Sequence, residues 1–123
     1  MKTYIAGPMS GIPEYNHPAF NAMAKRLRDV GIDVLNPAEI DAADPHDMPV
    51  QPWEFYLRRD LELVAREVDR MVMLPGWRKS PGARLEHHVG KALKMEIIYP
   101  SKFEDWYKIQ QAFVAVERSM ANA

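Results

Sequence analysis

Glu86 is an acidic residue in the apolar face of a predicted helix. Burying a carboxylate there costs free energy unless the group has a hydrogen-bonding or charged partner, or a function. The segment from Ser80 to Met95 predicts this helix, with Ser80 as its N-cap and Pro81 at its first position. At about 100° per residue, its apolar face consists of Leu85, Val89, Ala92 and Leu93. Because an unpaired buried carboxylate costs several kcal/mol, Glu86 is the first candidate for a chemical role.

A second acid, Asp60, has the same unusual placement. It lies in the predicted helix from Trp53 to Glu67 and projects between Tyr56 and Trp53, within the apolar stripe. Two inward carboxylates near the strand ends of one small sheet suggest a paired acid site. Each acid taken alone has a structural alternative, which is a hydrogen bond to a backbone amide or an ion pair with an arginine. The pattern leaves that alternative open.

A glycine-rich turn follows the first predicted strand. It consists of Gly7, Pro8, Met9, Ser10 and Gly11. The backbone N–H groups of such a turn can bind an anion or a sugar oxygen. The turn matches neither a P-loop nor G-x-G-x-x-G, so a sharp exit from the strand is an equal alternative. Two roles are likewise open for Ser80, because its hydroxyl can cap the helix and can also contact a ligand.

Strands and helices alternate along the chain without an internal repeat. We expect strands at 3–6, 32–35, 70–74 and 96–99, helices at 17–30, 53–67, 80–95 and 104–118, and an Asp- and Pro-rich loop at 38–52. This alternation predicts one α/β domain over residues 1–123, a flavodoxin/Rossmann-like three-layer sandwich with a mostly parallel sheet of about four to five strands. Ligands of such sheets bind at the carboxyl ends of the strands, and long loops are often functional lids.

The composition excludes several kinds of site. The net charge is −1, which argues against a surface for duplex nucleic acid. The chain has no cysteine, so it has no disulfide, thiolate metal site or thiol nucleophile. Its four histidines lack metal-binding spacing, and a G-x-S-x-G nucleophile elbow is missing. We therefore expect no metal and no cofactor. The first residues form neither a signal peptide nor a membrane span, so we expect a cytoplasmic protein without a membrane partner.

The ordered motifs of the chain resemble those of the nucleoside 2-deoxyribosyltransferase-like superfamily, in particular its small phage and prophage domains. The matching motifs are YIAGPMSG at 4–11, NHPAF at 16–20, NPAE at 36–39, YLRRDL at 56–61 and LPGWRKSPGARLE at 74–86. They follow the family's order through most of the chain up to Glu86. The resemblance implies the fold expected above, and it also implies an activity in nucleotide metabolism.

The resemblance implies catalytic roles for three residues. In the family, a glutamate near the start of this helix attacks the anomeric carbon of a 2-deoxyribosyl group, and Glu86 occupies its position. An aspartate of the preceding helix contacts the leaving base or assists its protonation, and Asp60 matches it. The tyrosine of the first strand orients the nucleophile, and Tyr4 matches it.

The resemblance also implies the substrate contacts. A polar residue six positions before the nucleophile contacts the sugar or phosphate, and Ser80 matches it, with Gly82 in the same motif. Phosphate-using relatives bind through the loop 7–11, but the arginine they carry there is missing from this chain. The cations left as substitutes are Arg58, Arg59, Arg78, Lys79 and Arg84.

Taken together, these residues predict cleavage of the N-glycosidic bond of a 2′-deoxynucleoside or its 5′-monophosphate through a covalent glutamyl intermediate. A carboxylate below the anomeric carbon stabilises the oxocarbenium-like transition state and can trap it, as in retaining glycosidases. Water as the acceptor gives hydrolysis and a second base gives transfer. The alternatives are a nucleotide-binding or sensor module without turnover, and an interaction protein whose acids pair with Arg58, Arg59 or Arg84.

A small-molecule nucleoside or nucleotide is the expected ligand, and a homodimer or higher homo-oligomer is the expected assembly. The family shares its site between subunits. The last predicted helix also has more apolar surface than a small sheet needs. The residues behind this expectation are Phe103, Trp106, Tyr107 and Phe113.

Overall fold

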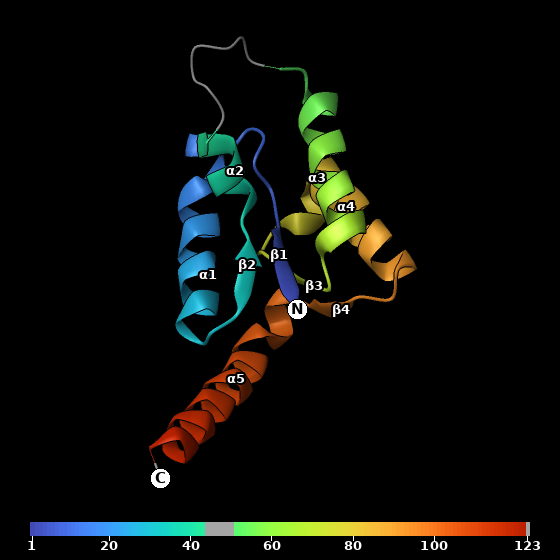
Figure 1. Ribbon diagram of the computed structural model, residues 1–123. Coiled ribbons are helices and arrows are strands. Elements are labelled where there is room, and N and C mark those ends of the chain that lie inside the picture. Colours follow the sequence, from blue (N-terminus) through green and yellow to red (C-terminus); the bar gives the residue numbers. More distant parts are fainter. Residues whose placement is uncertain (44–50, 123) are drawn as a thin grey trace.

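A computed structural model, which describes residues 1–43 and 51–122, contains one sheet of four parallel strands in the order β2-β1-β3-β4 (Figure 1). The strands are β1 (Lys2–Ala6), β2 (Asp33–Leu35), β3 (Arg70–Met73) and β4 (Glu96–Ile98). Each pairs with its neighbour in parallel. The predicted α/β class and parallel sheet are therefore confirmed.

Helices cover both faces of this sheet, which gives the flavodoxin/Rossmann-like three-layer arrangement. The helical segments are η1 (Pro13–Asn16), α1 (His17–Asp29), α2 (Pro37–Ala43), α3 (Trp53–Glu67), η2 (Trp77–Lys79), α4 (Pro81–Ala92) and α5 (Pro100–Ala121). The side chains of β1 alternate between the two faces, as a strand requires. Ile5 packs with residues of α1, α2 and α5, whereas Tyr4 and Ala6 pack with residues of α3 and α4.

The predicted loop at 38–52 is wrong in its first part, because α2 occupies Pro37–Ala43. Asn36 begins this helix: its Oδ1 accepts from the Ala38 N–H at 3.0 Å, and its Nδ2 donates to Asn21 at 3.0 Å. Asn-Pro is therefore an N-cap followed by a first helical residue rather than a strand end. A helix of seven residues is too short to show a period. Residues 44–50, with the expected lid, lie outside the described residues.

The buried face of α4 differs from the predicted one. Leu85 and Leu93 are 43% and 51% exposed, whereas Glu86 and Gly90 are buried. The reason is a close approach of α4 to the sheet, since a Cβ on Gly90 would lie 2.4 Å from the Met71 sulfur. Small residues permit this approach, and the larger leucines are turned outward. Glu86 therefore lies on the true inner face of the helix.

The last helix is longer than the predicted 104–118 and divides into two parts. Its first turns cover the sheet, and Phe103 and Tyr107 belong to the core, so these two do not form free apolar surface. The rest of α5 projects beyond the body of the protein (Figure 1). In the part of the chain that the structure describes, no helix has the length and apolar character needed to cross a membrane.

Candidate active site

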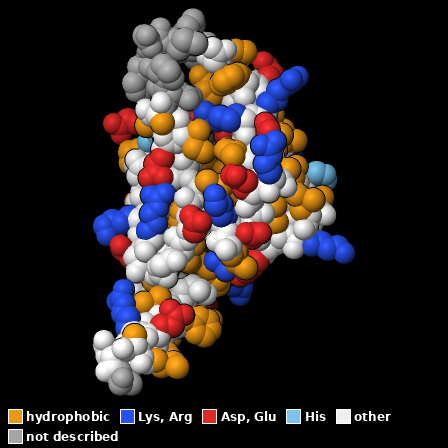
Figure 2. Space-filling model, viewed as in Figure 1, with side chains coloured by type: hydrophobic (Ala, Val, Ile, Leu, Met, Phe, Trp, Pro, Cys, Tyr) orange, Lys and Arg blue, Asp and Glu red, His pale blue; other side chains and the backbone are white. Residues whose placement is uncertain are grey.

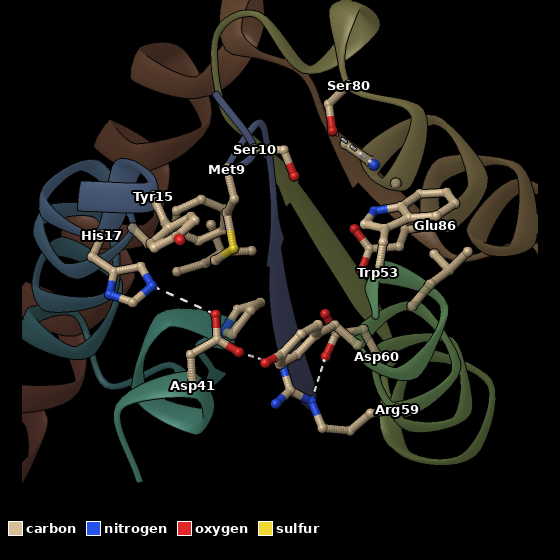
Figure 3. A pocket seen from close by; sticks show the side chains of 18 of the residues that line it. Met9, Ser10, Tyr15, His17, Asp41, Trp53, Arg59, Asp60, Ser80 and Glu86 are labelled. Atoms are coloured by element: carbon tan, nitrogen blue, oxygen red, sulfur yellow. Dashed lines mark hydrogen bonds and ion pairs between the residues drawn. The ribbon is translucent and has the colours of Figure 1, made fainter. Parts of the chain in front are cut away.

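A cavity with a volume of about 700 Å³ opens at the carboxyl end of β1 (Figure 3). β1 is the point where the strand order reverses, because the chain passes to β2 on one side and later to β3 on the other. Ligands of open α/β sheets bind at such a switch point. The cavity has the size of a small-molecule site.

The structure brings most of the sequence-predicted residues to this one cavity. Its lining includes Tyr4, Gly7, Met9, Ser10, Asp60, Ser80, Gly82 and Glu86. Pro8 and Gly11 are the two predicted residues that do not line it. The three predicted catalytic residues come from three elements: Tyr4 from β1, Asp60 from α3 and Glu86 from α4. These residues are far apart in sequence, and the parallel sheet places them together.

Glu86 is a buried acid whose carboxyl is hydrogen-bonded. Its side chain is 6% exposed, and its Oε2 accepts from the Tyr4 hydroxyl at 2.5 Å. Burial raises the pKa of Glu86 to about 8, the hydrogen bond from Tyr4 opposes that rise, and the nearby charge of Asp60 adds to it. At neutral pH this carboxyl is therefore largely protonated.

Tyr4 serves as a fixed donor to that carboxyl. Its side chain is fully buried, and burial, followed by the charges of Glu86 and Asp60, raises its pKa well above the ordinary value. The hydroxyl therefore keeps its proton across the working range of pH. It can orient Glu86 without exchanging protons with it.

Asp60 lies in a chain of polar groups across the cavity. Arg59 Nε donates to Asp60 Oδ1 at 3.0 Å, and Arg59 Nη2 donates to Asp41 Oδ1 at 2.5 Å. At the far end, His17 Nε2 is 3.5 Å from Asp41 Oδ2. The chain links α1, α2 and α3 (Figure 3). The ion pair of Asp60 with Arg59 corresponds to the structural alternative for this acid, whereas Glu86 forms no ion pair with a described residue.

The loop after β1 has the sharp geometry expected from its glycines. A Cβ on Gly7 would lie 2.8 Å from the Leu74 Cβ, and Gly11 has φ +79°. Asn16 Nδ2 donates to the Pro8 carbonyl at 2.9 Å and fixes the loop. Glu14, Tyr15 and Asn16 all have positive φ, a strained conformation for non-glycine residues. This left-handed turn places Tyr15 at the cavity wall.

Ser80 is confirmed as the N-cap of α4, since its Oγ accepts from the Ala83 N–H at 3.2 Å. Next to it, Gly82 leaves room for Trp53, whose ring would lie 4.0 Å from a Cβ at that position. Figure 3 shows the Trp53 ring beside Glu86. Trp53 is 46% exposed, so one side of this aromatic ring is open to a ligand.

Several residues of the cavity were not predicted from the sequence as site residues. They are His17 and Asp41 in the chain of polar groups, and Tyr15, Phe20, Trp53, Phe55 and Tyr56 among the aromatic residues. Arg59, predicted only as a candidate cation for a 5′-phosphate or a partner for the acids, also lines the cavity. Trp53 and Tyr56 were predicted as part of the apolar stripe of α3, which helical periodicity does not distinguish from a ligand wall. Within residues 1–43 and 51–122, no group of three His, Cys, Asp or Glu side chains has the arrangement of a metal site.

Comparison with known proteins gives a family without an assigned activity. A family model described as a domain of unknown function (DUF4406) matches residues 1–99. This match covers every strand and every residue of the cavity. No curated protein matches the chain.

Proposed function

The chain belongs to this family of unknown function, and from the geometry of its site we propose that it cleaves the N-glycosidic bond of a 2′-deoxynucleoside or its 5′-monophosphate. One observation carries the proposal: the buried Glu86 carboxyl lines a ligand-sized cavity and is held by the Tyr4 hydroxyl. The ordered motifs that resemble the nucleoside 2-deoxyribosyltransferase-like superfamily support the same chemistry. We also propose a cytoplasmic location, where an enzyme of nucleotide metabolism would meet such substrates.

Glu86 is the proposed nucleophile. Tyr4 engages Oε2, so we assign the attack on C1′ of the sugar to Oε1 of the ionised carboxylate. An ester bond forms as the C1′–N bond breaks, and the bonding electron pair leaves with the base. The base then takes up a proton. A water molecule next attacks C1′, the ester C1′–O bond breaks, and Glu86 is released as a carboxylate while the proton from water passes to solvent.

Asp60 and Trp53 are the proposed contacts for the base. The Arg59 guanidinium forms an ion pair with Asp60, with Nε 3.0 Å from Oδ1. An ionised Asp60 accepts a hydrogen bond from an amino group or a protonated ring nitrogen of the leaving base. This role requires no proton from Asp60 itself. Trp53 offers an exposed ring beside Glu86, against which a base can stack.

Hydrolysis is the favoured outcome over transfer to a second base, in line with the small phage-type domains that the sequence resembles. The proposed polar contacts to the sugar are Ser80 and Ser10, which line the cavity, and the neighbouring loop after β1. Of the cations considered for a 5′-phosphate, only Arg59 lines this cavity. We therefore assign it the phosphate contact if the substrate is a monophosphate.

A non-catalytic nucleotide-binding module is the second candidate function. It is favoured by the protonated state of Glu86 at neutral pH and by the ion pair of Asp60 with Arg59. These two features suit a site that binds a neutral base and leaves it intact. A nucleotide that stays bound and unchanged through a long incubation distinguishes this module from an enzyme.

We also infer a homo-oligomer that forms through the projecting part of α5. Four exposed apolar residues lie there at heptad spacing, on one side of the helix: Ile109, Phe113, Val116 and Met120. Figure 2 shows hydrophobic side chains on this projecting end. Such a stripe is typical of a helix that packs against another.

Light scattering tests this inference. The wild-type protein should have a multiple of the protomer mass, and the double variant Phe113→Ser with Val116→Ser should have the protomer mass. The control Gln111→Ser, on the opposite side of the helix, should have the same mass as the wild type. A monomeric wild-type protein contradicts the inference.

The covalent intermediate can be detected directly. Substrate is mixed with the protein, the reaction is quenched in acid, and the intact mass and the peptide that contains Glu86 are measured. A gain equal to one deoxyribosyl group, or its phosphate, on that peptide supports the proposal. Base release without any adduct, at a rate unchanged in Glu86→Gln, contradicts it.

A further inference from the structure

A second cavity, of about 530 Å³, lies at the carboxyl ends of β3 and β4. It shares an edge of the sheet with the Glu86 cavity, because all four strands are parallel. Its walls are the loop 75–79 after β3 and the residues 99–102 at the start of α5. No described residue lines both cavities, although Lys79 and Ser80 are neighbours in sequence.

The charge of this second cavity is positive. Arg78, Lys79 and Lys102 line it, and its described lining contains no Asp or Glu. Some arginines elsewhere pair with acids, as Arg26 does with Glu104 and Arg28 with Glu39. None of the three lining cations forms an ion pair with a described residue, and the Arg78 guanidinium lies over the Trp77 ring at 4.7 Å. In a chain of net charge −1, this is a local concentration of unpaired cations.

The start of α5 lies at the same cavity. No side chain caps its first turn, in contrast to α4, which Ser80 caps. Pro100 has no N–H and the Lys102 N–H donates to the Tyr99 carbonyl at 3.0 Å, so this helix end acts mainly through its dipole, which favours an anion. Trp77, which is 6% exposed and lines the cavity, has a buried indole N–H with no hydrogen-bond partner among the described residues. The cavity thus combines unpaired cations with the positive end of a helix dipole.

We propose that this second cavity binds a phosphate-class oxyanion, either inorganic phosphate or the phosphate group of a small monoester. The three cations supply charge, and the dipole of α5 adds a positive potential at its start. The proposal goes beyond the proposed function, because it uses neither Glu86 nor any other residue of the first cavity.

The three tryptophans allow both cavities to be followed in one experiment. Trp53 lines the first cavity, Trp77 lines the second, and Trp106 lines neither. Indole N–H resonances of ¹⁵N-labelled protein are followed as inorganic phosphate or methyl phosphate is added, with chloride at equal ionic strength as the reference. We expect a saturable shift of the Trp77 resonance with at least one of the two phosphates, and none with chloride. The compound that binds more tightly, inorganic phosphate or methyl phosphate, indicates whether the site takes free phosphate or the phosphate group of a monoester.

Variants test whether the cations hold the anion. Lys79→Ala with Lys102→Ala should weaken binding about tenfold or more, since each removes a charge-assisted contact. Lys108→Ala, an exposed lysine further along α5, should leave the affinity unchanged. Both lysines are exposed, so the fold is expected to survive, and dispersed spectra verify it. A Trp77 resonance that stays unmoved with both phosphates, that shifts equally with chloride, or that saturates in the double variant with the wild-type affinity overturns the proposal. The Trp53 resonance reports separately on the first cavity.

Discussion

The Tyr4 hydroxyl donates a 2.5 Å hydrogen bond to Glu86 Oε2, joining residues 82 positions apart in sequence. This bond connects the central strand β1 with α4 and lies at the wall of the Glu86 cavity. The bond favours a lower pKa of Glu86, whereas burial has the larger effect and raises that pKa to about 8. Three of the predictions below follow from these two opposing effects.

The pH dependence of activity should report the ionisation of Glu86. The proposed attack requires a carboxylate, so kcat/KM should rise with pH and level off above a pKa near 8. The measurement is base release at low substrate concentration between pH 5.5 and about 9.5. A profile that is already flat from pH 6 upward would show that Glu86 is ionised in the free enzyme, or that it is not the group that limits the rate.

Tyr4→Phe should lower activity and also move the pH profile. The hydroxyl favours the ionised form of Glu86, so its removal should shift the rising limb to higher pH. At pH 7 we expect a loss of about tenfold or more in kcat/KM, the size of one hydrogen bond to a charged group. Tyr107→Phe is the matched control, because its hydroxyl donates to the Arg26 carbonyl on the other face of the sheet. A Tyr4→Phe variant whose pH profile of kcat/KM is unshifted would contradict the proposal that the Tyr4 hydroxyl orients Glu86 and favours its ionised form.

The free energy of unfolding should also depend on pH through the ionisation of Glu86, and the direction of this dependence follows from the pKa. The folded state retains the Glu86 proton up to pH about 8, whereas the unfolded chain releases it near 4.5. Between these values the folded state binds more protons, so this group's contribution to the free energy of unfolding falls as pH rises, by at most about 1.4 kcal/mol per pH unit.

Glu86→Gln removes this titration from the folded state. The variant should be more stable than the wild type at pH 8, with a melting temperature several degrees higher, and the difference should shrink toward pH 5. Denaturant unfolding of both proteins at pH 5, 6.5 and 8 measures the difference directly. A Glu86→Gln protein that is less stable at pH 8 would mean that Glu86 is ionised and favourably paired when folded.

The ring of Trp53 should contribute to the binding of a base. Stacking on one aromatic ring contributes about 1–3 kcal/mol, so Trp53→Ala should raise KM by about tenfold or more. Trp53 is half-exposed at the start of α3, and the fold should therefore tolerate the change. Leu85→Ala, an exposed apolar residue on α4, serves as the control for lost apolar surface. An unchanged KM in Trp53→Ala would place the base elsewhere in the cavity.

The fold could be predicted from the sequence because its signals are local. Strand and helix alternate with short connections, α3 begins and ends at the predicted residues Trp53 and Glu67, and Ser80-Pro81 begins α4 as expected. The elements that were missed lack such signals. α2 is too short to show a helical period, and the outward turn of Leu85 depends on the close contact of Gly90 with Met71, which only the assembled fold shows.

The site could be predicted only in part for a related reason. Glu86 and Asp60 were found because a carboxylate in an apolar stripe conflicts with its surroundings. Arg59 and Asp41 do not conflict with theirs, and their ion pair joins two helices whose packing sequence periodicity does not give. Trp53 resembled an ordinary core residue, and only its exposure and its place beside Glu86 in Figure 3 mark it as a ligand contact.

The most direct test is chromatographic. Wild-type protein, Glu86→Gln and the control Glu67→Gln, an exposed acid at the end of α3, are each incubated with every common deoxynucleoside and its 5′-monophosphate, with and without a second free base. We expect release or exchange of base by the wild type and the control, and a loss of about a thousandfold or more in Glu86→Gln. Base release by Glu86→Gln at the wild-type rate would contradict the role of Glu86 as the nucleophile.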